Sequence, residues 1–112
     1  MELAVDMIGD VAIVVLPVDE LTASNVGDFK RDIAPLLDTH TKMVLDLTRL
    51  LFADSAALGT FISCLRRLNA KGGDLKLCAM SQQVRDVFAL VRLDRIFDIY
   101  ATKAEAAGSY HR

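Results

Sequence analysis

The chain alternates between short apolar runs and longer segments in which apolar residues recur every three or four positions. The short runs predict β-strands, and they lie at residues 3–7, 11–16, 42–47, 74–79 and 96–100. The periodic segments predict amphipathic helices, and they begin near Thr22, Ser55, Ser81 and Thr102. The resulting order, β-β-α-β-α-β-α-β-α, permits few folds for a chain of 112 residues.

The first two strands differ from the others in how they are connected. Only residues 8–10 separate them, and Gly9-Asp10 is a turn signal typical of a hairpin; the second strand is the more apolar of the two. Each later strand follows a helix, which favours parallel pairing through right-handed crossovers. The sequence therefore predicts an α/β fold in which a mixed sheet of about five strands packs against helices.

The ends of two helices carry sequence signals. Thr22 or Ser24 is a candidate N-cap for the first helix. Pro35 lacks a backbone donor and clashes with the preceding turn, so we expect this helix to end or kink near Ala34. Lys71, followed by two glycines, predicts the end of the second helix.

Composition describes one globular domain over residues 1–112. The chain is 53% hydrophobic and 25% charged, with a net charge of −2 that does not favour nucleic-acid binding. No apolar run is long enough to span a bilayer, and the N-terminus lacks a signal-peptide pattern, so we expect a cytoplasmic protein without membrane insertion. Cys64 and Cys78 lie in apolar contexts and are expected to be buried reduced thiols, with a disulfide as the alternative.

No set of residues in the sequence predicts catalysis. His40 lies in a polar loop and His111 lies at the C-terminal end, which does not favour a Ser-His-Asp arrangement. No metal-ligand spacing and no phosphate-binding glycine motif are present. We therefore expect a protein that is not an enzyme and that needs no cofactor or metal.

The stretch from Phe52 to Thr60 joins the third predicted strand to an amphipathic helix. Asp54 and Ser55 stand where this helix begins. Two interpretations of Ser55 remain open at this point. It is either a simple N-cap, a common role for serine, or an exposed hydroxyl at a helix end that can accommodate a phosphate.

Residues 54–59, DSAALG, resemble the DS[SAT]GLG signature of the STAS domain family, which includes anti-sigma factor antagonists. Asp19 with Thr22-Ala23 resembles the D-x-x-T-A segment of the family, and residues 45–47 resemble its V-L-D-L strand. Residues 93–100 resemble its L-x-x-I-F-x-I-Y ending, followed by the closing helix. The resemblance covers nearly the whole chain and implies a STAS-like mixed sheet.

The resemblance implies a phosphorylation-switched binding protein. In the stand-alone antagonists of this family, the serine at the position of Ser55 is phosphorylated by an anti-sigma factor that is also a serine kinase. The unphosphorylated protein sequesters that anti-sigma factor and frees a sigma factor, and a PP2C-like phosphatase restores it. The candidate partner-binding residues near Ser55 are Asp19, Leu21, Thr22, Asp54, Ala56 and Leu58. Leu21 and Leu58 can contact a partner only if their side chains are exposed.

The chain departs from the family pattern at three places. Ala57 replaces the usual glycine, so we expect a loop backbone that does without a positive φ there and an altered access to Ser55. Pro17 precedes Asp19 where glycine or a polar residue is common. Residues 90–93 lack the serine-glycine pair common before the last leucine.

Two other functions are consistent with the same residues. The chain is alternatively an unmodified STAS scaffold or accessory module of a signalling or lipid-transport complex. It is alternatively a binder of a small ligand, such as a nucleotide or lipid, at the junction of strand and helix. The sequence leaves a monomer and a weak dimer equally open.

Overall fold

The computed structural model describes residues 1–111. Its strands are β1 (Ala4–Ile8), β2 (Val11–Val15), β3 (Glu20–Leu21), β4 (Lys42–Asp46), β5 (Phe52–Ala53), β6 (Asp74–Cys78) and β7 (Ile99–Tyr100). Its α-helices are α1 (Val26–Thr39), α2 (Ser55–Ala70), α3 (Gln82–Leu90) and α4 (Lys103–Gly108), and two short 3₁₀ helices cover Leu93–Arg95 and Ser109–His111.

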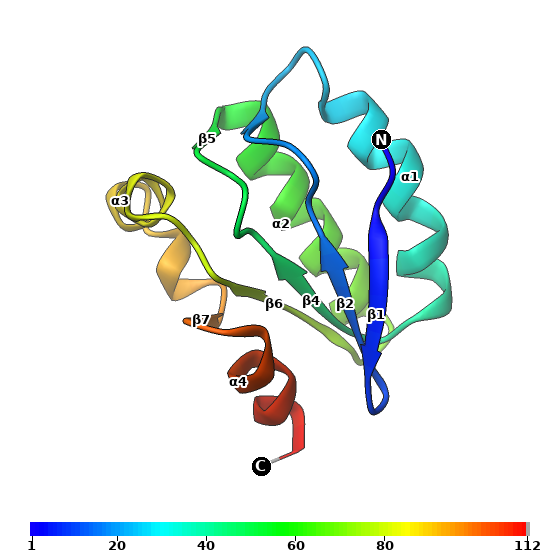
Figure 1. Ribbon diagram of the computed structural model, residues 1–112. Helices are drawn as coiled ribbons and strands as arrows, with labels where there is room; N and C mark the ends of the chain where they lie inside the picture. Colours follow the sequence, from blue (N-terminus) through cyan, green and yellow to red (C-terminus); the bar gives the residue numbers. More distant parts are fainter. Residues whose placement is uncertain (112) are drawn as a thin grey trace.

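Five strands form one mixed sheet in the order β1-β2-β4-β6-β7 (Figure 1). β1 and β2 pair as an antiparallel hairpin, and every other pair in this sheet is parallel. The predicted five-stranded mixed sheet is therefore confirmed. β1 is exposed along its whole length because it forms an edge, whereas β2 lies inside the sheet and is almost entirely buried.

Helices cover both faces of the sheet. α1, α2 and α3 contribute to the larger core, which holds Phe29, Phe61 and Phe88. α4 lies on the opposite face, where Ala106 and Ala107 join a smaller apolar cluster with β2, β4 and β6 (Figure 1). The sheet is thus a middle layer, as expected when strands alternate with amphipathic helices.

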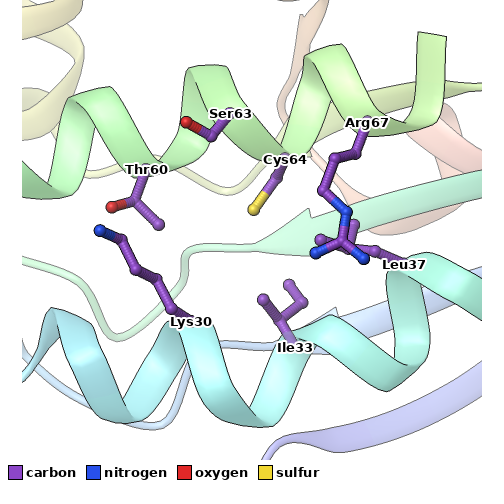
Figure 2. Close-up of a pocket in the computed structure, with 7 residues that line it drawn as sticks. All are labelled: Lys30, Ile33, Leu37, Thr60, Ser63, Cys64 and Arg67. Atoms are coloured by element: carbon purple, nitrogen blue, oxygen red, sulfur yellow. The ribbon is translucent and has the colours of Figure 1, made fainter. Parts of the chain in front are cut away.

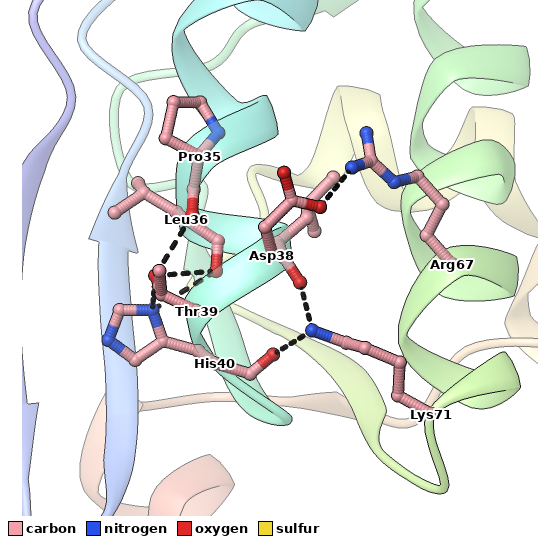
Figure 3. Close-up of polar contacts among 8 residues, drawn as sticks. Pro35, Leu36, Asp38, Thr39, His40, Arg67 and Lys71 are labelled. Atoms are coloured by element: carbon pink, nitrogen blue, oxygen red, sulfur yellow. Dashed lines mark hydrogen bonds and ion pairs between the residues drawn. The ribbon is translucent and has the colours of Figure 1, made fainter.

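α1 runs through Pro35 to Thr39, so the prediction that it ends near Ala34 is wrong. Pro35 is exposed, while Ile33 and Leu37 on either side of it are buried. Figure 3 shows how the helix end is held: the Lys71 ammonium donates to the carbonyl oxygens of Leu37 and, at 3.0 Å, His40. Packing and these side-chain contacts outweigh the roughly 3 kcal/mol cost of an interior proline.

The first helix also begins differently from the prediction. Asn25 occupies the N-cap position, and neither Thr22 nor Ser24 caps the helix. The Thr22 carbonyl instead accepts from the N–H groups of Asn25 and Val26, at 3.1 and 2.8 Å, while Asn25 Oδ1 accepts from the Thr22 N–H at 2.8 Å. Hydrogen bonds between Asn25 and Thr22 therefore close the turn before α1, and Thr22 and Ser24 lie at the protein surface.

The sequence pattern missed two short strands and overestimated another. β3 and β5 form a separate two-residue parallel ladder, too short to show any periodicity. The last strand is confined to Ile99–Tyr100, because a 3₁₀ turn precedes it and Phe97 turns into the core. The two cysteines are buried free thiols, as predicted. Within residues 1–111, every helix is too short or too polar to cross a lipid bilayer.

Candidate functional site

The candidate site is built around the start of α2, where one carboxylate joins two segments. Asp54 is the N-cap residue, and its Oδ1 accepts from the Ala57 N–H at 3.0 Å. Its Oδ2 accepts from the N–H of Ala23, 31 residues earlier, at 2.9 Å. Backbone donation from Ala57, and then from Ala23, lowers the pKa of Asp54, because both hydrogen bonds favour the charged carboxylate.

Ser55 is the first residue of α2 and is exposed. Since Asp54 occupies the cap, the Ser55 side chain is not needed to satisfy the helix end. Among residues 1–111, no hydrogen-bond partner is found for its hydroxyl. The interpretation of Ser55 as the N-cap is therefore wrong, and the structure presents a solvated hydroxyl at the positive end of a helix.

Ala57 does not perturb this arrangement. It lies in the first turn of α2, with its side chain fully buried in the core. Within residues 1–111, the non-glycine positions with positive φ are Ala79 and Arg92. The backbone at Ala57 does without a positive φ, as expected, but this position is helical and not part of a loop, and alanine suits it.

The β3–β5 ladder brings the segment before α1 next to the start of α2. The Asp19 carbonyl accepts from the N–H groups of Leu51 and Phe52, at 2.7 and 3.1 Å, and the Asp54 N–H donates to the Leu21 carbonyl at 3.2 Å. Asp19 is exposed, and the Thr22 hydroxyl hydrogen-bonds that of Ser24 at 2.7 Å. Asp19, Thr22, Asp54 and Ser55 therefore lie at one end of the molecule.

The apolar residues predicted for partner contact are less available. Leu21 is fully buried, so its side chain offers no contact surface and that prediction is wrong. Ala56 is half-buried, and Leu58 is 9% exposed. Leu51 and Phe52, which the sequence pattern did not single out, are 49% and 50% exposed and lie shortly before Asp54 in the chain. The available signal was an apolar run at residues 50–53 that continues beyond the preceding strand.

A small hollow lies beside these two residues. Phe52 and Leu58 line it together with Val84 and Val87 of α3. The surface around Ser55 thus combines a free hydroxyl, carboxylates and half-exposed apolar side chains, a composition suited to protein contact.

Both histidines lie away from this surface. His40 follows the C-terminal end of α1, while the site lies beyond its N-terminal end (Figure 1). His111 Nε2 contacts Asp10 Oδ1 at 2.7 Å in the β1–β2 turn. Residues 1–111 hold no cluster of three or more potential metal-ligating side chains.

Comparisons with known proteins place this geometry in context. The STAS domain family model matches residues 3–106. The chain is similar to a Thermotoga maritima protein named "Putative anti-sigma factor antagonist", with 31% identity over 105 residues that cover 92% of this chain and 93% of the relative.

Solved structures show the same relationship. One is the crystal structure of a Thermotoga maritima protein described as a "putative anti-sigma factor antagonist". It has a TM-score of 0.90 and 30% identity, and the match covers 98% of this chain and 95% of that one. Bacillus SpoIIAA in its phosphorylated form has a TM-score of 0.72 and 24% identity, covering 98% and 100%, and shares the fold. The chain therefore belongs to the STAS domain family.

Proposed function

We propose that this protein is an anti-sigma factor antagonist whose binding is switched by phosphorylation of Ser55. The observation that carries the proposal is the exposed Ser55 hydroxyl, left free because Asp54 caps α2. In the unphosphorylated state, the protein binds an anti-sigma factor that is also a serine kinase, and so frees a sigma factor. A PP2C-like phosphatase reverses the modification. The names of the relatives support this role, and it requires no catalysis by the chain itself.

The physical basis of the switch is the charge added at the interface. A phosphoserine carries about −1.5 to −2 charges at neutral pH. The N-terminal end of α2 tolerates an anion, while Asp54 opposes it, so we expect little refolding. A partner packed against Ser55 must bury the new charge, and this desolvation weakens binding. The shared fold of phosphorylated SpoIIAA is consistent with a modification that leaves the architecture intact.

The proposed interface combines the polar groups around Ser55 with a neighbouring apolar pair. Asp19, Thr22 and Asp54 supply polar contacts at its centre. Leu51 and Phe52 replace the buried Leu21 as the main apolar contacts, because half of each side chain is exposed. Aromatic side chains such as that of Phe52 are enriched at the cores of protein interfaces.

The first experiment locates the modification. The wild type, Ser55→Ala and Ser63→Ala proteins are incubated with ATP and the co-encoded serine-kinase anti-sigma factor, and their intact masses are measured. Ser63 is a matched control because it is an exposed serine on the same helix. We expect one phosphate on the wild type and on Ser63→Ala, and none on Ser55→Ala. A phosphorylated Ser55→Ala protein would contradict the assignment of Ser55.

The second experiment tests the switch by calorimetric titration of the same partner. We expect Ser55→Asp to weaken binding at least tenfold, equivalent to about 1.4 kcal/mol. Phe52→Ala should also weaken binding, whereas Leu90→Ala, which removes an 83% exposed side chain from α3, should not. Equal affinity of Ser55→Asp and wild type would refute the switch. A stable complex without any phosphorylation would favour the unmodified scaffold.

A further inference from the structure

A second hollow lies between α1 and α2, apart from the surface around Ser55. Its volume is about 180 Å³. Seven residues line it, as Figure 2 shows: Lys30, Ile33, Leu37, Thr60, Ser63, Cys64 and Arg67. None of them belongs to the proposed interface. Any ligand bound in this hollow would therefore be independent of the proposed interface around Ser55.

The floor of this hollow is apolar. Ile33, Leu37 and Cys64 form it, and each is at most 3% exposed. The hydroxyls on the α2 side are already used as donors: Thr60 donates to the Ala56 carbonyl at 2.9 Å and Ser63 to the Gly59 carbonyl at 3.1 Å. The hollow consequently suits a hydrocarbon group better than a polar one.

Two cations from opposite helices stand at its rim, as Figure 2 shows for Lys30 and Arg67. Arg67 is partly neutralised, because its guanidinium donates to Asp38 at 2.6 Å. Lys30 has no hydrogen-bond or ion-pair partner among residues 1–111. Burial raises the pKa of the Cys64 thiol on the floor to about 11, and the positive charges of Arg67 and Lys30 act to lower it. Both charges are therefore felt at the floor of the hollow.

We propose that this hollow binds a small carboxylic acid with a short hydrocarbon chain. The carboxylate pairs with the Lys30 ammonium, and the chain packs on Ile33, Leu37 and Cys64. Lys30 disfavours a cationic ligand. Asp38, which pairs with Arg67 at the other end of the hollow, disfavours an anion with more than one negative charge. The volume is below the range typical of drug-sized ligands, which favours a short chain over a nucleotide.

The test uses octanoate as the probe and follows backbone amides in ¹H–¹⁵N spectra of the full chain. Octylamine and 1-octanol have the same number of carbons as octanoate, but the first is a cation and the second is uncharged. Comparing the three separates the role of the negative charge from that of the hydrocarbon chain. Lys30→Gln removes the charge but keeps a long exposed side chain. Arg66→Gln is the matched control, because Arg66 is an exposed cation on α2 that does not line the hollow. Ser63→Trp closes the hollow from its exposed side.

We expect saturable shifts confined to the residues that line the hollow. Lys30→Gln and the change to octylamine should each weaken binding at least tenfold, Ser63→Trp should abolish it, and Arg66→Gln should leave it unchanged. The spectra also report whether each variant is folded. The proposal is overturned by non-saturating or scattered shifts, by equal binding of octanoate and octylamine, or by a Lys30→Gln protein that binds as tightly as the wild type.

Discussion

At the scale of single residues, Asp54 connects the function of the site to the stability of the fold. One carboxylate caps α2 and also holds the Ala23 N–H of the segment before α1. Ser55 is exposed, and its hydroxyl is not needed as the cap. The same carboxylate therefore both stabilises the site and frees the hydroxyl that we propose is modified.

The lowered pKa of Asp54 predicts a pH dependence. Because the folded-state pKa lies below the unfolded value of about 3.9, the stabilisation is complete above about pH 4 and is lost as the pH falls through the folded-state pKa. Asp54→Asn should lower stability at neutral pH, and the difference from the wild type should shrink in acid. Urea midpoints at several pH values measure this. Asp6→Asn, at an exposed strand residue, controls for the replacement of a carboxylate by an amide.

Two glycines predict opposite responses to alanine. A Cβ on Gly73 would lie 2.0 Å from the Thr41 carbonyl oxygen, so Gly73→Ala should cost about 1–3 kcal/mol of unfolding free energy. Gly59 lies inside α2 with nothing within 4 Å of a Cβ, so Gly59→Ala should add roughly 0.5–1 kcal/mol. Urea unfolding measures both. A Gly73→Ala protein as stable as the wild type would contradict the close approach.

At the scale of elements, α1 illustrates tertiary packing that overrides a local signal. Its buried residues Ile33 and Leu37 flank Pro35, and side chains associated with α2 secure its end: Lys71 through carbonyls and Arg67 through Asp38. The helix therefore persists because a neighbouring helix supports it.

Replacing Pro35 tests how much unfolding free energy the proline costs α1. Pro35→Ala restores a backbone donor and removes the ring clash, although it also frees the unfolded chain. We expect a net gain of about 1–2 kcal/mol in the free energy of unfolding. Pro17→Ala is the control, because Pro17 lies outside any helix and should bring no gain. Unchanged or reduced stability in Pro35→Ala would show that the helix is not strained there.

At the scale of the whole molecule, a chain of aromatic contacts links the helices of the larger core. Phe61 of α2 packs edge-on against Phe29 of α1, with ring centroids 6.0 Å apart, and lies 6.5 Å from Phe88 of α3. Phe88 in turn lies 6.1 Å from Phe97, which precedes β7. Phe61 therefore occupies the centre of the helical layer.

Phe61 and Phe52 form a matched pair for separating stability from binding. Phe61→Ala should lower the free energy of unfolding by about 3–5 kcal/mol, because it leaves a cavity in the core. Phe52→Ala removes a half-exposed ring and should cost much less, while weakening partner binding. Denaturant unfolding separates the two. A loss of stability in Phe52→Ala as large as that in Phe61→Ala would place Phe52 in the core instead of the interface.

The sequence by itself determined the order of the helices and of the five main strands, the mixed five-stranded sheet, and the position of Asp54 and Ser55 at a helix start. These features depend on local periodicity and on preferences at helix ends, which neighbouring residues encode. It did not determine which of the two residues caps α2, because serine and aspartate both suit that position.

Only the tertiary structure decided the make-up of the site. Ala23 donates to Asp54 across 31 residues, and the two-residue β3–β5 ladder buries Leu21 while leaving Phe52 half-exposed. The persistence of α1 through Pro35 was decided in the same way. Periodicity specifies which face of an element is apolar, whereas contacts between distant segments depend on how all elements pack together.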